Sequence, residues 1–175
     1  MKKSEKKWMS LMKKQSLILS NFVIILFFFS FSFSYSADTK SISGKTDVID
    51  GDTIKIKGQS IRLVGIDAPE KKQLCQKPYL SLFIFTFSKS YPCGETSTNS
   101  LKKLINNQII LCKIEEKKDF FKRYLGTCFK GKVNINSWLV KNGHALAFRK
   151  YSKKYLNEAL YAKNNKIGLW QGTFE

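Results

Sequence analysis

The fold is decided by residues 48–70, which read VIDGDTIKIKGQSIRLVGIDAPE. Strand-forming residues in this stretch are interrupted by turn-forming groups, first Asp50-Gly51, then Lys57-Gly58, then Asp67-Ala68-Pro69. An Asp-Gly pair between two strand-like segments is a strong hairpin signal, and a proline ends a strand because it cannot donate to the next ladder. The stretch therefore predicts a three-stranded meander with strands at 43–48, 53–57 and 61–66.

The downstream sequence alternates between helical and strand-like segments. Its hydrophobic spacing predicts a helix at 96–106, strands at 109–115 and 123–130, and helices at 133–142 and 151–165. Gly168-Leu169-Trp170 is expected to close the domain. Five strands with helices after the third and the fifth fit a small barrel of the OB type, an α+β fold that is mainly β, with about three helices.

The connection between the meander and the first helix, residues 71–95, is predicted to be mostly loop. Residues 79–87 within it are nevertheless strongly apolar. Such a run can form a strand, a buried flap, or a patch that contacts a membrane or another protein. The sequence leaves these alternatives open.

Residues 1–36 have the organisation of a secretory signal peptide. Six lysines lie within residues 2–14, an uninterrupted apolar run covers 22–29, and small residues stand at Ser34 and Ser36 before Ala37. The apolar run is short for a membrane span of about 20 residues. We therefore expect an exported protein, periplasmic, at the cell surface or secreted, with an uncleaved anchor as the alternative. A linker is expected at 37–41, followed by one domain at 42–175.

Four cysteines, an even number, suggest two disulfides in an exported chain. Three pairings are possible, and we favour Cys75–Cys93 with Cys112–Cys128. These pairs close loops of similar length, and each is worth about 3 kcal/mol in the chain-entropy model. Free cysteines in a reducing compartment are the alternative. No spacing of Cys and His supports a zinc site, since His144 is the single histidine in the sequence.

The chain carries 31 Lys+Arg against 13 Asp+Glu, a formal net charge of +18. Such an excess favours a polyanionic partner, with nucleic acid first and an anionic membrane second. The alternative is that the positive charge reflects only solubility or a general lysine bias of the host genome, without a specific partner. We expect DNA and RNA as partners, a monomer, and no stable membrane association once the signal segment is cleaved.

Within this basic chain, carboxylates are concentrated in residues 50–70. Hairpin geometry places Asp52 near the start of one strand, beside the neighbouring strand that ends at Asp67. A carboxylate cluster is costly unless a cation lies among the carboxylates, and hard cations prefer oxygen ligands. The nearby Arg62 adds a planar fork that can hold two phosphate oxygens. This pattern points to a metal-dependent enzyme that acts on phosphodiesters.

The same residues resemble the staphylococcal nuclease, or thermonuclease, family. The matching segments are 48–53, Arg62-Leu63, 65–70, Asp119 to Arg123, 138–145 and 168–170, so the resemblance covers about residues 42–172. It implies an OB-fold, calcium-dependent nuclease of DNA and RNA that leaves 3′-phosphate ends. It also implies site roles by position: Asp52 and Asp67 as calcium ligands, Ala68 as a ligand through its carbonyl, Asp50 as support for the metal shell, Glu70 as general base, and Arg62 with Arg123 as phosphate clamps.

The segment before Arg123 departs from the family pattern. The family often has tyrosine and then glycine there, whereas this chain has Phe121 and Lys122. Phenylalanine can stack on a substrate but cannot donate a hydroxyl hydrogen bond, and the lysine adds charge. We expect Phe121 and Lys122 to contact substrate, together with a nucleotide-contacting edge that includes Arg149 and Tyr151.

Two other functions compete with the nuclease. One is a catalytically silent OB-fold module that binds nucleic acid at the cell surface. The other is a cationic protein that associates with membrane through its N-terminal segment and residues 79–87. The presence of both arginines and of Glu70 favours the enzyme.

Overall fold

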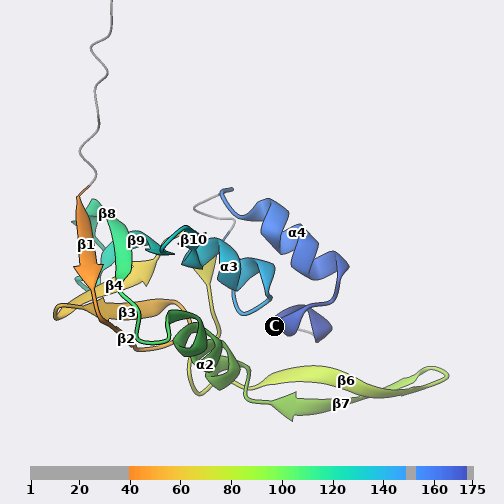
Figure 1. Ribbon diagram of the computed structural model, residues 1–175. Helices are drawn as coiled ribbons and strands as arrows, with labels where there is room; N and C mark the ends of the chain where they lie inside the picture. Colours follow the sequence, from red (N-terminus) through yellow and green to blue (C-terminus); the bar gives the residue numbers. More distant parts are fainter. Residues whose placement is uncertain (1–39, 149–152, 173–175) are drawn as a thin grey trace, which may run out of the picture. The chain divides into compact units, whose positions relative to one another are not determined.

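The computed structural model describes residues 40–148 and 153–172, and residues 39–175 form one compact unit, separate from residues 1–38 (Figure 1). The predicted signal segment, most of the linker, and the residues Arg149 and Tyr151 lie outside the described part. Among the described helices, none is long and apolar enough to cross a membrane.

A curled, seven-stranded sheet forms the main part of this unit. Its order is β1-β8-β9-β4-β3-β2, and β10 pairs with the C-terminal end of β9. The strands are β1 (Ser41–Gly44), β2 (Thr46–Val48), β3 (Thr53–Ile56), β4 (Gln59–Leu63), β8 (Ile110–Lys118), β9 (Tyr124–Lys130) and β10 (Val133–Asn134). Neighbours pair in antiparallel fashion except β4 and β9, which are parallel. The curled sheet with three helices is the predicted α+β fold of OB type.

Two predicted strands are each divided in the structure. The strand expected at 43–48 is broken at Lys45, because β1 pairs with β8 whereas β2 pairs with β3. The strand expected at 61–66 ends at Leu63, and β5 (Ile66–Asp67) leaves the main sheet to pair with β11 (Leu146–Ala147). Gly65, with φ of 77°, permits the change of direction between them.

The helices cover one part of the sheet and close the core. They are α2 (Cys93–Ile105), α3 (Ile135–Lys141), α4 (Leu156–Asn164) and the 3₁₀ helix η1 (Gly168–Gln171). The helix predicted at 96–106 begins earlier, directly after Pro92, a residue that is well suited to a helix start. One continuous apolar core joins β3, β4, β8, β9 and the helices; its largest fully buried side chains are Tyr155, Ile54, Ile56, Ile61, Leu63, Ile66, Leu101, Ile110, Ile135, Leu139 and Val140.

Asn136, at the start of α3, is a buried polar residue with its full set of partners in the core. Its Oδ1 accepts the Cys128 N–H at 3.0 Å, and its Nδ2 donates to the carbonyls of Val64 at 3.0 Å and Gly126 at 3.2 Å. These contacts hold α3 against the junction of the parallel strands β4 and β9. Arg62 lies in β4, and Arg123 directly precedes β9.

Replacing Asn136 with alanine should lower the free energy of unfolding by about 3 kcal/mol, because it leaves buried backbone groups without partners. Urea denaturation measures the change. Asn165→Ala is the matched control, since the exposed Asn165 amide bonds only its own helix carbonyl, Tyr161 O, at 2.8 Å. An Asn136 variant as stable as the Asn165 variant would contradict the assigned role.

Both predicted disulfides are confirmed. Cys112 and Cys128 stand directly opposite each other in the β8–β9 register, with Cα atoms 4.0 Å apart. Cys75 and Cys93, with Cα atoms 5.6 Å apart, join the first residue of β6 to the first residue of α2. None of the described cysteines is free.

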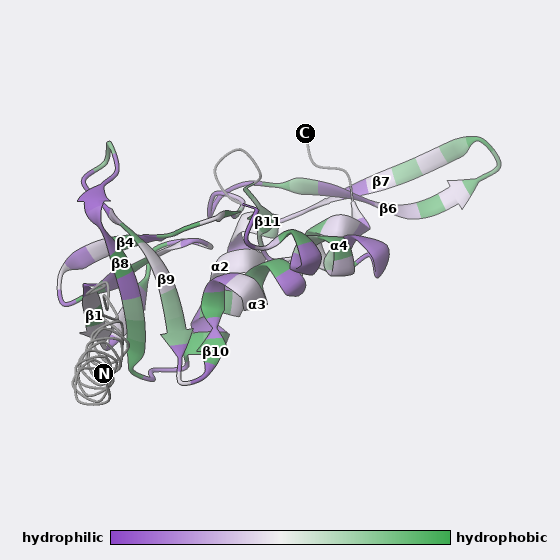
Figure 2. Ribbon diagram, turned by 90° about the horizontal axis from the view of Figure 1, so that it is seen from above, coloured by the Kyte–Doolittle hydropathy of each residue, from purple (hydrophilic) through white to green (hydrophobic). Residues whose placement is uncertain are grey.

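The connection at 71–95 was predicted to be mostly loop. In the structure most of it is a long β-hairpin. Its strands are β6 (Cys75–Leu82) and β7 (Phe85–Tyr91), paired with each other in a sheet of their own. Figures 1 and 2 show the far end of the hairpin extending beyond the neighbouring helices. Residues 79–87 are exposed, so the buried flap is excluded as an interpretation of the apolar run.

Candidate functional site

The sheet brings the two ends of the 48–70 motif together. Thr53 pairs with Arg62 in the β3–β4 register, and the Leu63 N–H donates to the Asp52 carbonyl at 2.8 Å, extending the ladder by one step. Asp67 ends β5, a few residues beyond. Asp52, Arg62 and Asp67 therefore meet at one edge of the sheet, as the meander predicted.

Arg62 lies between the two aspartates. Its Nη1 contacts Asp52 Oδ2, and its Nη2 donates to Asp67 Oδ1 at 2.7 Å. The Asp52 side chain is 5% exposed, whereas the Asp67 side chain is 53% exposed. One carboxylate is thus fixed in the protein interior and the other faces solvent, with a cationic group between them.

The Asp50-Gly51-Asp52 turn is held tightly in place. Asp50 Oδ1 accepts the Asp52 N–H at 3.1 Å, and Asp52 Oδ2 accepts the Ala68 N–H at 3.1 Å. A Cβ on Gly51 would collide with Ser97 Oγ and Ala68 Cβ, so only glycine fits there. The amide of Ala68 thus helps to orient Asp52, and the role of its carbonyl as a metal ligand stays a prediction.

Arg123 is fixed by Asp119. The Arg123 backbone N–H donates to Asp119 Oδ1 at 2.9 Å, and Arg123 Nε donates to Oδ2 at 2.8 Å. Burial raises the pKa of Asp119, but the hydrogen bonds and positive charge of Arg123, with a further bond from the Phe121 backbone, together hold that pKa below its ordinary value. Asp119 is therefore a stable anionic partner at neutral pH.

Thr53 connects the two arginines. Its hydroxyl donates to Asp52 Oδ1 at 3.0 Å and accepts from Arg123 Nη1 at 3.3 Å. A continuous chain of polar contacts, which we call the arginine relay, runs through Arg123, Thr53, Asp52, Arg62 and Asp67. Sequence reasoning assigned no role to Thr53, although its place directly after Asp52, at the start of a strand, was an available signal.

Glu70 lies on an exposed turn between β5 and β6. Its backbone N–H donates to Gln73 Oε1 at 3.0 Å, and its carbonyl accepts the Gln73 N–H at 2.7 Å. A Cβ on Gly94 would collide with the Glu70 carbonyl, so the start of α2 packs directly against this backbone. The turn is thus anchored near Asp67, while the Glu70 side chain is accessible to solvent.

The residues before Arg123 form its turn. Lys122 adopts φ of 62°, a conformation that favours glycine, and its N–H donates to the Asp119 carbonyl at 2.9 Å. The Arg123 guanidinium carbon lies 5.2 Å from the centre of the Phe121 ring, which is 72% exposed. The aromatic ring therefore supports the arginine from its solvent side.

A cavity of about 270 Å³ opens beside the exposed aspartate. It is lined by Asp67, Ala68, Pro69, Gln73, Cys75, Leu146 and Leu169. Apart from Asp67 and Gln73, the residues that line the cavity are apolar. Among the described residues, no three His, Cys, Asp or Glu side chains converge in a way that could hold a metal ion by themselves.

Comparison with known proteins matches residues 60–172 to the family model described as staphylococcal nuclease homologue. The match includes Arg62, Asp67, Glu70 and Arg123, and it begins after Asp50 and Asp52.

The curated proteins similar to this chain include the following three. Succinoglycan biosynthesis protein ExoI of Rhizobium meliloti (strain 1021) is 33% identical over 134 residues, 74% of this chain and 65% of that protein. Probable staphylococcal-like nuclease CAN3 of Oryza sativa subsp. japonica is 32% identical over 112 residues, 63% of this chain and 25% of that protein. An uncharacterized endonuclease of Haemophilus influenzae (strain ATCC 51907 / DSM 11121 / KW20 / Rd) is 31% identical, over 63% of this chain and 52% of that protein. The chain thus spans between a quarter and just under two thirds of these relatives.

Proposed function

Because this chain belongs to the staphylococcal nuclease family, we propose that it is an exported, calcium-dependent nuclease that hydrolyses phosphodiester bonds of DNA and RNA. The observation that carries the proposal is the arginine relay, which places two guanidinium groups beside two aspartates at one edge of the sheet. The net charge of +18 suits a polyanionic substrate.

The arginines bind the phosphate and stabilise the charge that develops on its oxygens. Both side chains are partly exposed, Arg62 at 21% and Arg123 at 25%, so their donors are accessible to a ligand. Asp119 and Thr53 fix Arg123, while Asp52 and Asp67 fix Arg62. Donors that are oriented before the substrate arrives stabilise a transition state at little reorganisation cost.

The residues fit a calcium ion in donor chemistry. Asp52 and Asp67 offer hard carboxylate oxygens toward one place, the Ala68 carbonyl is a further oxygen donor in sequence, and Asp50 holds the turn that carries Asp52. In the structure the same two carboxylates contact Arg62, so the guanidinium lies between them and would share these oxygens with the ion. When bound, calcium would supply additional positive charge for the phosphate oxygens.

Glu70 accepts the proton of the attacking water. Water oxygen bonds to phosphorus, the bond from phosphorus to the 5′ oxygen breaks, and the departing oxygen takes a proton from solvent. An exposed carboxylate on an anchored turn can reach such a water, provided that it comes within about 3 Å. The phosphate then stays on the 3′ side of the cleaved bond.

The chemistry of the product ends tests this reaction. Digestion of a defined single-stranded oligonucleotide in calcium should give fragments with 3′-phosphate and 5′-hydroxyl ends, measured by mass spectrometry. Fragments with 5′-phosphate ends would contradict the proposed bond cleavage. Binding of the oligonucleotide in calcium without any cleavage would favour the alternative, a catalytically silent nucleic-acid-binding module.

Replacing Thr53 with valine should lower kcat about tenfold, the equivalent of one hydrogen bond of roughly 1.4 kcal/mol. Valine keeps the shape of the buried residue but removes the hydroxyl that joins Asp52 to Arg123. Steady-state hydrolysis of DNA measures the loss. Thr127→Val is the matched control, because the Thr127 hydroxyl bonds Lys154 Nζ on the surface of β9. Equal turnover in the two variants would remove Thr53 from the site.

A further inference from the structure

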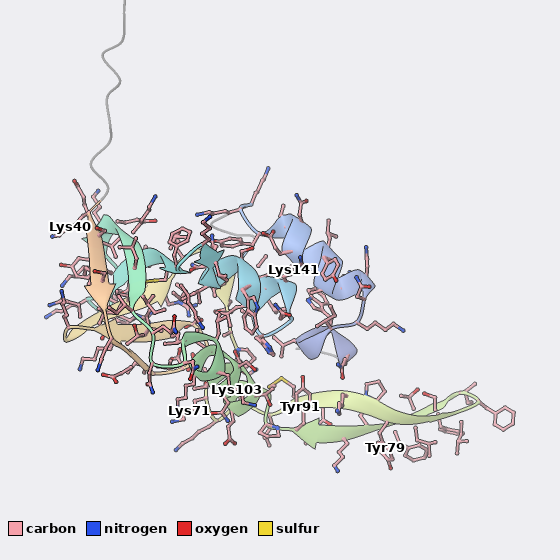
Figure 3. The ribbon with its side chains drawn as sticks, in the orientation of Figure 1. Lys40, Lys71, Tyr79, Tyr91, Lys103 and Lys141 are labelled. Atoms are coloured by element: carbon pink, nitrogen blue, oxygen red, sulfur yellow. A yellow bond between two sulfur atoms is a disulfide. The ribbon has the colours of Figure 1, made fainter. Side chains whose placement is uncertain are left out.

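The β6–β7 hairpin carries a concentration of exposed apolar side chains that the nuclease site does not use. Seven large apolar residues within 79–87 are exposed: Tyr79, Leu80, Leu82, Phe83, Ile84, Phe85 and Phe87. Phe83 is fully exposed and Ile84 is 89% exposed. Figure 2 shows hydrophobic residues gathered toward the turn of the hairpin, and Figure 3 shows Tyr79 farther out along it than Tyr91. An exposed apolar patch of this kind marks an interaction surface.

The apolar residues are arranged on one face and at the tip. In the antiparallel register Leu80 pairs with Phe87 and Leu82 with Phe85, and paired residues share a face. The alternate pair, Ser81 with Thr86, lies on the opposite face, where the two hydroxyls are 3.4 Å apart. The end of the hairpin is therefore amphipathic, with an apolar face that continues into the turn.

The turn itself shows that large apolar residues are kept where the backbone does not favour them. Phe83 and Ile84 connect the strands, and Phe83 has φ of 52°. Glycine, asparagine or aspartate is favoured at such a position, and a bulky side chain there is strained. Local backbone strain is retained where the residue has a function, which supports a role for the tip.

Positive charge lies behind the apolar end. Lys77 and Lys89 pair directly across the hairpin, and Lys71 and Lys72 precede it, while residues 71–92 contain no acidic residue. Like charges opposite each other in a ladder are unfavourable unless an anion lies near them. At about 3.3 Å per residue, the lysine pair lies roughly 7 Å behind Tyr79 and Phe87, and the apolar residues extend roughly 10–13 Å from there to the tip.

We propose that this hairpin is a membrane-docking element that inserts its apolar tip into the surface of an anionic phospholipid bilayer. A depth of 5–10 Å is typical of apolar groups that enter the interface. The lysine pair, roughly 17–20 Å from the tip, then stays on the aqueous side within about 10 Å of the anionic headgroups, a distance comparable to the Debye length at 0.1 M salt. Insertion is shallow, because the open edges of a two-stranded hairpin need water for their backbone groups. The docking is peripheral and reversible. It is therefore compatible with the expectation from sequence that the protein has no stable membrane association once the signal segment is cleaved.

The arrangement of charge favours a bilayer over the other occupants. A strip that binds single-stranded nucleic acid interleaves cations with aromatic rings, but residues 78–88 contain no charged residue. The hairpin of a second copy offers no anion for the lysine pair, since residues 71–92 contain no acidic residue. A bilayer surface instead offers acyl chains for the tip and phosphates for the lysines, in the order in which the hairpin presents them.

Co-sedimentation with vesicles tests the proposal without using nuclease activity. Residues 37–175 suit the experiment, since they contain the complete compact unit with both disulfides. We expect stronger binding to vesicles that contain phosphatidylglycerol than to phosphatidylcholine alone. Phe83→Gly/Ile84→Ser, which suits the turn, should lower partitioning about tenfold or more. Lys77→Ala/Lys89→Ala should lower the preference for anionic vesicles roughly tenfold.

The matched control is Ile109→Ser/Leu160→Ser, which removes two exposed apolar side chains outside the hairpin and should leave binding unchanged. Far-ultraviolet circular dichroism confirms that each variant is folded. Equal vesicle binding by the wild type and the tip variant overturns the proposal. It is also overturned if the tip substitution converts a dimer to a monomer in light scattering, or abolishes binding of single-stranded DNA in chelator, without a change in vesicle binding.

Discussion

We expect that replacing Arg62 with lysine will lower kcat for DNA hydrolysis by about 10²–10³-fold in a variant that still folds. The substitution keeps the positive charge, so a loss of activity reports the geometry of the guanidinium rather than the charge. Arg62 holds Asp52 and Asp67 with its two terminal nitrogens, and a lysine ammonium cannot reproduce this planar fork. Turnover of plasmid DNA in calcium measures the effect.

Arg123→Lys is the companion variant for the Arg62 prediction. The Arg123 guanidinium also uses two donors in fixed directions, Nε to Asp119 and Nη1 to Thr53, so we expect a loss of the same order. Thermal unfolding of each variant establishes that it is folded. A folded lysine variant with near-wild-type turnover removes that arginine from the mechanism.

As the proposed general base, Glu70 should be sensitive to substitution, and we expect Glu70→Gln to lower kcat by about 10²–10⁴-fold, the range for loss of a positioned general base. The amide has nearly the same shape as the carboxyl group but cannot accept the proton of the attacking water. Stability should be unchanged, because the Glu70 side chain is exposed and the turn is held by backbone contacts with Gln73. Binding of DNA should be retained.

Glu95→Gln is the matched control for the Glu70 prediction. Glu95 is exposed in the first turn of α2, so the control makes the same chemical change in a neighbouring element. Its turnover should stay within about twofold of the wild type, as for surface substitutions away from special features. Equal turnover of the two glutamine variants would mean that another group accepts the proton.

The parts of the fold that could be predicted are those in which local chemistry and burial agree. The turns at Asp50-Gly51 and Lys57-Gly58 separate strands whose inward residues are fully buried, so turn signals and hydrophobic alternation gave the same answer. The pairing Cys112–Cys128 was favoured because the two pairs close loops of similar length, and it joins two neighbouring strands. By contrast, the break at Lys45 arises because the chain changes pairing partner, which no local signal records.

A strand at residues 79–87 was predicted only as one of several alternatives, and the role of Thr53 was not predicted. For residues 79–87 the sequence left open a strand, a buried flap or a contact patch, and the apolar composition could not decide among them, because these residues form strands but are exposed. Thr53 gains its role only because the parallel pairing of β4 and β9 places Arg123 next to the first hairpin, some seventy positions along the chain. Sequence identifies charged groups readily, but the neutral group that joins them depends on the completed fold.

The most direct test of the account is cleavage of plasmid DNA and of a single-stranded RNA by purified residues 37–175, in calcium and in chelator, with Glu70→Gln measured alongside. The account predicts degradation of both substrates by the wild type in calcium, none in chelator, and near-absence of cleavage by the variant in either condition. A folded wild-type protein that binds DNA in calcium but leaves both substrates intact would contradict it.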